Sequence, residues 1–481
     1  MNFAIVRYLI GWMLGIESIF LLLPALTAVI YGEPELPAYL IAAAISLAGA
    51  ALLCHRKPKN TRFYAREGYV TVALCWLILA VIGALPFVLS REIPFFIDAL
   101  FETVSGFTTT GATILGDVEA LSHASMLWRC LTHWVGGMGV LVFMLIVLPL
   151  AGGQTIFLMR AESPGPSVSK MSPHMRDTAT ILYAIYFGLT VLQMILLLIG
   201  GMPLFDAICV SLGTAGTGGF GNWNDSIAHY NSAYLQNVIT VFMILFGINF
   251  SAYFLILTRK FRQAFRIEEI RVYLGVIFVF AGLIAFNVRP MFGSLRESFH
   301  HALFQVASII TTTGFSTVDF DQWPTFSRAL LVLLMFIGAC AGSTGGGMKC
   351  SRILLLGKSV KKELMCLIHP RLVRVNKMDG QRVPHEVMRS INVFVVAYAF
   401  IFILSLLIIS LNCEDLVTCF TSVATTLNNV GPGLSLCGPT CNFGFFPPLS
   451  KGVLIFDMLA GRLELFPMLL LFTPGTWQRN K

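Results

Sequence analysis

The chain has 481 residues, of which 56% are hydrophobic and 12% are charged, and its formal net charge is +8. A soluble protein has about twice that share of charged residues, so the composition excludes an ordinary globular protein in water. It also excludes a disordered, collagen-like, coiled-coil or secreted disulfide-scaffold protein. The apolar residues form blocks long enough to cross a bilayer, with basic clusters between many of them, which predicts an all-α polytopic membrane protein.

The first two apolar blocks predict a pair of spanning helices. Tyr8 to Tyr31 is too long for the core of a signal peptide and lacks a convincing cleavage site, and Leu36 to Leu53 follows it. The next loop, His55 to Gly68, is strongly basic, as are three later segments, 160–176, 259–271 and 358–389. These four segments hold most of the 33 Lys and Arg residues and are expected in the cytoplasm, whereas the loops between them carry acids. The alternation gives about ten spans, with both termini cytoplasmic.

Four short segments are too polar to cross a membrane and too apolar for a loop in water. They align with one another without a gap: each is a run of small and apolar residues that leads into a polar tetrapeptide ending in Gly. The segments are Asp98 to Gly111, Asp206 to Gly219, His301 to Gly314 and Thr418 to Gly431. A unit of roughly one hundred residues is therefore repeated four times. Each unit is interpreted as an outer helix, a half-helix, the tetrapeptide and an inner helix.

This repeat predicts four pseudo-symmetric pore units around a central pore, preceded by two extra transmembrane helices. The expected boundaries are 1–66 for the N-terminal helix pair, then 67–158, 159–262, 263–365 and 366–481 for pore units 1 to 4, with an intramembrane gating loop in unit 3. Close helix packing through small residues would explain one such segment. Four in register favour a polar cavity, because non-helical backbone at membrane depth survives only where protein or water satisfies its amide groups.

The tetrapeptides offer backbone carbonyl oxygens to a monovalent cation that has lost its water. Glycine permits the backbone conformations that turn successive carbonyls toward an axis. Each half-helix also directs the negative end of its dipole at the ion. Asp98, Asp206 and Glu414, near half-helix starts, either add a cation-attracting field or cap the helices. The predicted filter residues are Thr109, Thr110, Gly111, Thr217, Gly218, Gly219, Thr312, Thr313, Gly314, Asn429, Val430 and Gly431.

A glycine-rich stretch interrupts the inner helix of unit 3, which is expected to start at about Ser327. A continuous helix there costs about 1 kcal/mol for each Gly relative to Ala, so a flexible break below the filter is predicted. The alternative is a close helix crossing through small residues. The predicted gate residues are Gly342, Ser343, Thr344, Gly345, Gly346, Gly347 and Lys349, together with Arg462 in the last span.

Arg462 is expected near the middle of its span, where a charge costs a few kcal/mol and needs a polar cavity or a carboxylate. Our hypothesis is that it repels cations in the closed pore. The alternative is an ion pair with Glu464 or Asp457 that only fixes packing.

The chain also has 11 Cys residues, without a CxxC motif, which are expected to be small core residues. Cys437 and Cys441 share one predicted outside loop, where a disulfide bridge and two free thiols fit the sequence equally well.

Three motifs resemble the Trk, Ktr and HKT superfamily of potassium transporters, which are single-chain relatives of potassium channels. The motifs are FETVSGFTTTGATIL from Phe101 to Leu115, ITTTGFSTVDF from Ile310 to Phe320 and AGSTGGGMK from Ala341 to Lys349. The resemblance covers nearly the whole chain. Because of the extra N-terminal pair of spans, the chain is most similar to the TrkH/TrkG branch.

The resemblance implies a potassium uptake subunit of the bacterial inner membrane, homodimeric, with K⁺ as the permeant ion and a separate pore in each protomer. It implies regulation by a cytosolic nucleotide-binding subunit of the TrkA type, with 160–165 and 358–389 as candidate docking segments, although basic loops also serve topology and lipid contact. It implies no organic cofactor and no nucleic acid. Glycine in all four filter segments accompanies potassium selectivity in this family. The fourth segment, with Asn428, Asn429 and Val430, departs furthest from the others.

Other functions fit the sequence less well. A secondary transporter of a different class, such as a cation symporter with inverted repeats, would place equivalent half-helices on opposite sides of the membrane, whereas the charge pattern places all four on one side. A membrane-embedded enzyme is disfavoured because His123, His133, His300 and His301 form no HExxH motif. A sodium-permeant homologue of the same fold is the nearest alternative, and coupling to protons or sodium leaves no signature in the sequence.

Overall fold

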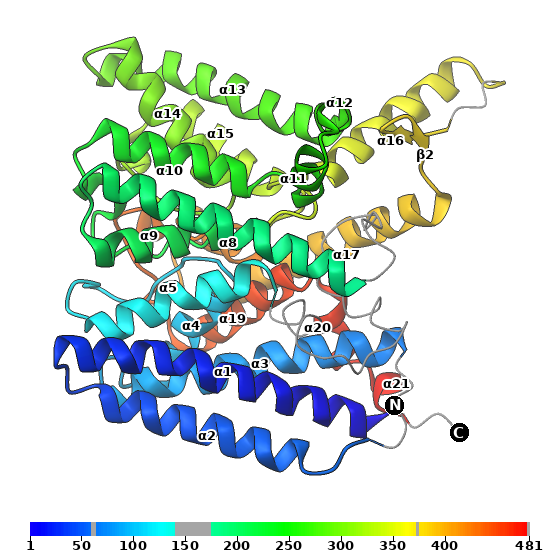
Figure 1. Ribbon diagram of the computed structural model, residues 1–481. Coiled ribbons are helices and arrows are strands. Elements are labelled where there is room, and N and C mark those ends of the chain that lie inside the picture. Colours follow the sequence, from blue (N-terminus) through cyan, green and yellow to red (C-terminus); the bar gives the residue numbers. More distant parts are fainter. Residues whose placement is uncertain (59–63, 140–174, 372–374, 479–481) are drawn as a thin grey trace.

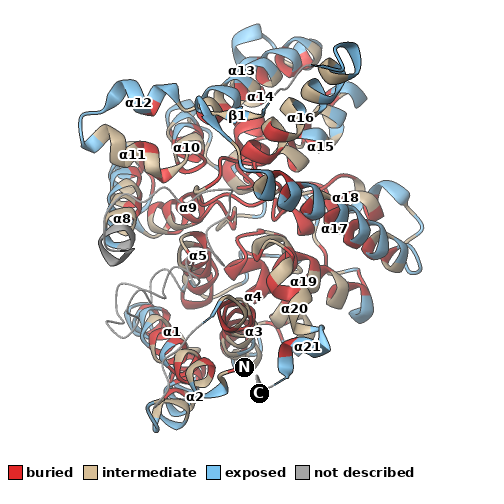
Figure 2. Ribbon diagram, turned by 90° about the vertical axis from the view of Figure 1, so that its right-hand side faces the viewer, coloured by how far each residue is buried: buried red, intermediate tan, exposed pale blue. Residues whose placement is uncertain are grey.

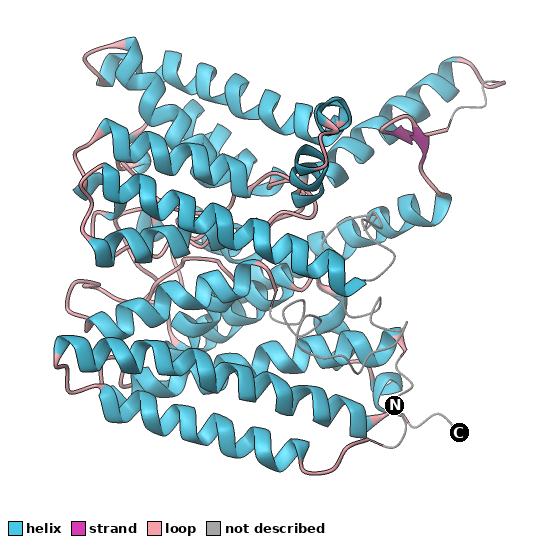
Figure 3. Ribbon diagram, in the orientation of Figure 1, coloured by secondary structure: helices cyan, strands magenta, loops and turns pink. Residues whose placement is uncertain are grey.

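The computed structural model describes residues 1–58, 64–139, 175–371 and 375–478. It is almost entirely helical in this part of the chain, with one short antiparallel hairpin (Figures 1 and 3). The chain is an all-α polytopic membrane protein. The boundaries expected at 158 and 159 lie outside the described residues.

The helices follow the predicted order along the chain. The N-terminal pair is α1 (Phe3–Tyr31) and α2 (Leu36–Cys54). The next group contains α3 (Ala65–Ser90), α4 (Phe96–Phe107) and α5 (His123–Gly137). The second contains α8 (Met175–Ile199), α9 (Leu204–Gly216), the 3-10 helix η1 (Ser226–His229), α10 (Ala233–Phe246), α11 (Phe250–Leu257) and α12 (Phe261–Arg266).

The third group contains α13 (Glu268–Val288), η2 (Arg289–Met291), α14 (Leu295–Ile310), η3 (Phe320–Gln322), α15 (Thr325–Ile337), α16 (Cys350–Ile368) and the strands β1 (Lys377–Met378) and β2 (Gln381–Arg382). The last contains α17 (His385–Ile409), α18 (Leu416–Leu427), η4 (Ser435–Cys437), α19 (Pro448–Arg462), α20 (Phe466–Leu471) and α21 (Pro474–Trp477).

Within the described ranges, six helices are long and apolar enough to cross a membrane: α1, α2, α3, α8, α13 and α17. A seventh candidate is the pair α10 and α11, which is bent by 93°. The prediction of about ten spans therefore stays a prediction. The long helices run side by side (Figure 1). Many of their Leu, Ile, Val and Phe side chains are exposed, as expected of surfaces that face lipid.

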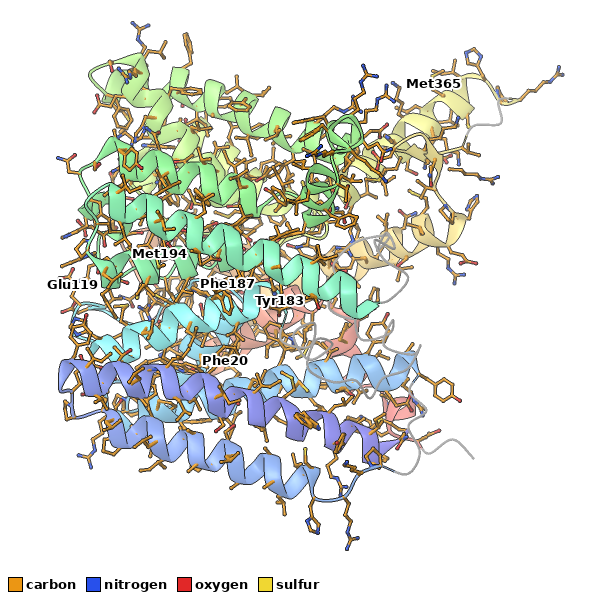
Figure 4. The ribbon with its side chains drawn as sticks, viewed as in Figure 1. Phe20, Glu119, Tyr183, Phe187, Met194 and Met365 are labelled. Atoms are coloured by element: carbon orange, nitrogen blue, oxygen red, sulfur yellow. The ribbon has the colours of Figure 1, made fainter. Side chains whose placement is uncertain are left out.

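The two ends of the helix bundle differ in charge. The acidic α1–α2 loop and Glu119 lie at one end, whereas the start of α1, the end of α2, α12, α21 and the projecting helix α16 with Met365 lie at the other (Figures 1 and 4). This segregation agrees with the topology expected from the loop charges.

The short helices α4, α9, α14 and α18 surround the middle of the molecule, where buried residues gather, while exposed residues occupy the rim (Figure 2). Hydrophobic contacts join the N-terminal pair to this centre, since one core cluster includes residues of α1, α2, α3, α4, α18 and α19. The fold therefore brings together four half-helices that are far apart in the sequence.

Among the described residues three inner helices are interrupted, whereas the sequence predicts one interruption. Helix α15 ends at Ile337 and α16 begins at Cys350, as predicted. Helix α10 bends into α11 near Gly247, and α19 ends at Arg462 before α20. Arg462 is the last residue of α19, and the interrupted span continues as α20, so its place near the middle of that span stays a prediction. Pro467 stands in the first turn of α20, directly after the last break. The bend between α10 and α11 has no proline and is in contact with the glycine-rich loop of unit 3.

Candidate ion-conduction site

Each of the four half-helices ends in the same hydrogen-bonded turn. The N–H group one residue before the terminal Gly of each tetrapeptide donates to a carbonyl five residues earlier, which is the bond that closes a Schellman turn. These bonds are Thr110 to Ser105 at 2.9 Å, Gly218 to Gly213 at 2.9 Å, Thr313 to Ser308 at 2.8 Å and Val430 to Thr425 at 2.8 Å. The turn ends the helix and redirects the chain at the same place in every segment.

Two residues of each tetrapeptide adopt left-handed backbone conformations. The terminal glycines have φ values of 78° at Gly111, 78° at Gly219, 87° at Gly314 and 98° at Gly431. Two residues earlier, φ is 56° at Thr109, 54° at Thr217, 58° at Thr312 and 56° at Asn429. A left-handed conformation in a residue with a side chain costs on the order of 1–3 kcal/mol and persists only where the surroundings enforce it. The sequence offers no signal for it, because threonine is a poor left-handed residue.

The four glycines form a closed ring. A Cβ atom on Gly111 would collide with the carbonyl oxygen of Gly218, and one on Gly219 with that of Thr313. In the same way, Gly314 lies against the carbonyl of Val430, and Gly431 against that of Thr110. Each segment thus touches the next, and the fourth returns to the first. Glycine is required at these positions by close backbone approach as well as by φ.

Threonine hydroxyls brace two of the segments. The Oγ1 atoms of Thr108 and Thr110 are 2.8 Å apart, and those of Thr311 and Thr313 are also 2.8 Å apart. In the fourth segment, Asn429 donates instead to Thr110 Oγ1 at 3.0 Å and to the carbonyl of Met458 at 2.9 Å. The fourth segment has Asn where the first and third have Thr, and the Asn429 side chain forms hydrogen bonds with the protein, which explains this difference in sequence.

A polar cavity of about 130 Å³ adjoins the ring. Its lining includes Gly111, Gly219, Gly314 and Gly431 together with the loops that follow each tetrapeptide. Carbonyl oxygens are hard ligands suited to alkali cations. Among the described residues, no group of three or more His, Cys, Asp or Glu side chains could hold a metal ion, so the ring offers main-chain oxygens and hydroxyls.

Two of the acids near the half-helix starts, Asp98 and Asp206, do not cap their helices, and their effect on a cation stays a prediction. Asp98 pairs with Lys451 Nζ at 2.5 Å, and Asp206 accepts a hydrogen bond from the Tyr230 hydroxyl at 2.6 Å. Both residues lie in the first turn of their helices, and the N-cap positions are Phe95 and Pro203. In the fourth segment the cap is Asp415 rather than Glu414. Its carboxylate accepts the N–H groups of Val417 at 3.2 Å and Thr418 at 3.1 Å.

Residues 338–349 form a loop that presses against the ring. The Gly346 N–H donates to Thr312 Oγ1 at 2.6 Å. A Cβ atom on Gly346 would lie 2.8 Å from the carbonyl oxygen of Asn428, so the loop contacts the third and fourth segments together. The ammonium of Lys349, which is 3% exposed, donates back to the carbonyls of Gly345 and Gly346. The predicted gate and the predicted filter are thus in direct contact.

The same loop explains the bend between α10 and α11. It takes over backbone groups that a continuous helix would pair internally: the Cys340 N–H donates to the carbonyl of Gly247 at 3.1 Å, and Phe250 donates to the carbonyl of Gly342 at 3.0 Å. Thr344 Oγ1 donates to the carbonyl of Phe246 at 3.2 Å. A helix whose polar groups are satisfied by a neighbour can break at low cost inside the membrane.

Arg462 joins the loop to α5. Its guanidinium donates to the carbonyl of Thr344 at 2.9 Å and to the carbonyls of Gly136 and Gly137, the latter at 2.8 Å. The last two carbonyls end α5, where the helix dipole favours a cation. The two carboxylates considered as partners of Arg462 have contacts of their own: Glu464 pairs with Arg352, and Asp457 accepts from Ser405 at 2.7 Å.

Glu269 is a further contact of the loop that the sequence did not reveal. It lies in the first turn of α13 and is 2% exposed. Its Oε1 atom accepts the N–H of Ala341 at 2.7 Å and the N–H of Ser351 at 3.0 Å, on either side of the glycine-rich stretch. An acidic residue in the first turn of a helix is usually explained by its interaction with the helix dipole. Only the tertiary structure shows that this carboxylate binds both ends of the loop.

Two other predictions can be placed. Cys437 is buried, Cys441 is exposed, and both are free thiols, so the structure contains no bridge between them. The candidate docking segment 160–165 lies outside the described residues. Much of 358–389 is described, and it forms the end of α16, the hairpin and the start of α17, which project from the basic end (Figure 1).

A ring of four carbonyl-bearing segments inside a helical membrane protein defines the class of cation-transporting membrane proteins. The chain belongs to the TrkH family, described as cation transport protein, whose family model matches residues 37–478. Members of this family are ion transporters and not enzymes.

Relatives match along nearly their whole lengths. The Trk system potassium uptake protein TrkH of Salmonella typhimurium is 38% identical over 485 residues, covering 99% of this chain and 100% of the relative. The Trk system potassium uptake protein TrkG of Escherichia coli is 33% identical, covering 98% of each. The crystal structure of the potassium transporter TrkH from Vibrio parahaemolyticus matches with a TM-score of 0.89 at 32% identity, covering 99% of this chain and 100% of that chain.

The cap of α18 gives a testable expectation for stability. Hydrogen bonds from the hydroxyls of Thr418 and Ser435, with the N–H groups of Thr418 and Val417, lower the pKa of Asp415 from 3.8 to about 2. Because the pKa is lowered in the folded state, this stabilisation is complete above pH 4 and is lost as the pH falls toward 2. At neutral pH, Asp415→Ala should cost about 1 kcal/mol and Asp415→Asn much less. Thermal unfolding in detergent measures both, and an unchanged midpoint for Asp415→Ala would contradict the assignment.

Proposed function

We propose that this protein takes up potassium across the bacterial inner membrane through a channel-like pore. The observation that carries the proposal is the closed contact of the four Gly-terminated segments, each lying against a carbonyl of the next. The names of the relatives, which are potassium uptake proteins, agree with it. Four pseudo-symmetric units around one pore are the arrangement that such a ring requires.

The ring supplies what a potassium ion needs when it leaves water. Carbonyl oxygens replace the hydration shell, and the half-helices direct their negative dipole ends at the ion. Glycine at the end of all four segments favours potassium over sodium, by the resemblance of this filter to those of the family. A secondary transporter with inverted repeats is disfavoured, because all four glycines border the same cavity.

The loop 338–349 serves as the gate in this proposal. It contacts the ring through Gly346, and Arg462 places a positive charge beside it. In a functional homodimer, a cytosolic nucleotide-binding subunit of the TrkA type would act on the projecting segment 358–389 and so on the loop, since α16 runs from one to the other.

Uptake of ⁸⁶Rb⁺ into liposomes that contain the purified chain tests the function. We expect rubidium uptake. Excess potassium should abolish this uptake, whereas sodium at the same concentration should not. The measurement is made with and without the cytosolic partner, and with an applied voltage or a pH gradient, which separates uncoupled conduction from symport. Sodium competition as strong as that of potassium would replace the proposal with a sodium-permeant homologue.

Arg462 tests the gate. Arg462→Ala removes the charge and the bridge between Thr344 and α5, so basal rubidium flux without the partner should rise several-fold. Arg462→Lys keeps the charge but not the contact with three carbonyls. Low basal flux in this variant would indicate electrostatic repulsion, and raised flux would indicate the hydrogen-bonded bridge. Arg328→Ala is the matched control, because Arg328 pairs with Asp321 away from the loop. Unchanged flux in Arg462→Ala would discard this role.

Glu269 tests how the loop is held. Glu269→Ala leaves two buried N–H groups unpaired, at a cost of about 1–3 kcal/mol each, so the open population and basal flux should rise about thirtyfold or more. Glu269→Gln keeps an oxygen acceptor and should change flux little. Glu268→Gln is the neighbouring control, since Glu268 pairs with Lys358 and not with the loop. Equal flux in Glu269→Ala and the wild type would show that the loop is held by other contacts.

A further inference from the structure

The second ring segment lacks the side chains that support the others. The residue before the ring glycine is Thr110 in the first segment, Thr313 in the third and Val430 in the fourth, all of them β-branched, but Gly218 in the second. The partner threonines Thr108 and Thr311 of the hydroxyl braces correspond to Gly216, again without a side chain. Three glycines among four residues give this segment the greatest backbone freedom of the ring.

The imidazole of His133 fills the missing space. The three atoms nearest to a Cβ built on Gly218 all belong to the His133 ring. His133 lies in α5 and is fully buried, so it reaches the second segment from a helix of the first unit. The side chain that would stand at position 218 in the other segments is thus replaced by a ring from elsewhere in the chain.

Both nitrogens of His133 are fixed by main-chain groups. The Phe220 N–H donates to Nε2 at 3.2 Å, so Nε2 carries no proton, and Nδ1 must carry the proton that it donates to the carbonyl of Gly106 at 2.7 Å. The imidazole is therefore neutral and has one tautomer. It connects α4, which leads into the first ring segment, with the residue directly after Gly219 in the second.

Resting on the function proposed above, we propose that His133 is a positioning residue of the ion filter, which holds the second segment in place of a threonine brace and thereby sets discrimination between potassium and sodium. The carbonyl of Gly218 is the oxygen that packs against Gly111. A shift of the Gly218 backbone therefore changes the ring itself. A histidine that served only as core packing would affect stability but not ion preference.

Two single variants test this role, one that removes the ring and one that keeps its volume. His133→Ala removes both the ring and its hydrogen bonds. His133→Phe keeps ring volume beside Gly218 but leaves the Gly106 carbonyl and the Phe220 N–H unpaired. Rubidium uptake in competition with sodium, measured in liposomes, should show that both variants lose about tenfold in discrimination, the effect of one or two unmade buried hydrogen bonds. His123→Ala, at the first position of the same helix, is the control and should keep wild-type discrimination.

If the single variants unfold, a double variant that restores a side chain at position 218 still tests the proposal. Gly218→Thr alone collides with the imidazole, whereas His133→Ala clears the nearest atoms around position 218. The double variant H133A/G218T then places a threonine where the first and third segments have Thr110 and Thr313. It should regain most of the lost discrimination and raise the thermal unfolding midpoint above that of His133→Ala.

Two results would overturn the proposal: wild-type discrimination in folded His133→Ala and His133→Phe, or no recovery in the double variant. Gly111→Ser, measured in parallel, tests the ring directly. If it also leaves discrimination unchanged, the function proposed for the ring fails. If only Gly111→Ser changes discrimination, the filter stands and the role of His133 alone is wrong.

Discussion

The structure depends on the approach of each ring glycine to a carbonyl of the next segment. No side chain fits between Gly111 and Gly218, or at the three equivalent contacts. This approach fixes which half-helices are neighbours and closes the ring. The left-handed conformations of Thr109, Thr217, Thr312 and Asn429 belong to the Schellman turns that end the half-helices and lead the chain into these contacts.

The glycine-rich loop of the third unit extends that constraint toward the basic end of the molecule. It contacts the ring through Gly346, takes backbone partners from the bent helix α10–α11, and is joined to α5 by Arg462. Loop and ring therefore form one connected set of main-chain contacts. Movement of the loop would also move its contacts with the third and fourth ring segments, which is the physical basis of the gate proposed above.

Membership of a cation transport family and the details of the site rest on different observations. The family follows from matches along nearly the whole chain and from the shared fold. The roles of individual residues follow from the contacts of this chain. Glu269, His133 and Asn429 all form hydrogen bonds with main-chain groups. No sequence motif predicts these contacts.

The sequence by itself determined the membrane class, the fourfold segment and the break after Ile337, because apolar block length, charge alternation and glycine content act locally along the chain. It could not determine the breaks near Gly247 and after Arg462, the left-handed threonines, or the partner of Arg462. These features depend on contacts between backbone groups of different units, which are about one hundred residues apart in the sequence. Only the tertiary structure decides them, since a polar group in the membrane takes whichever partner the fold brings within hydrogen-bond distance.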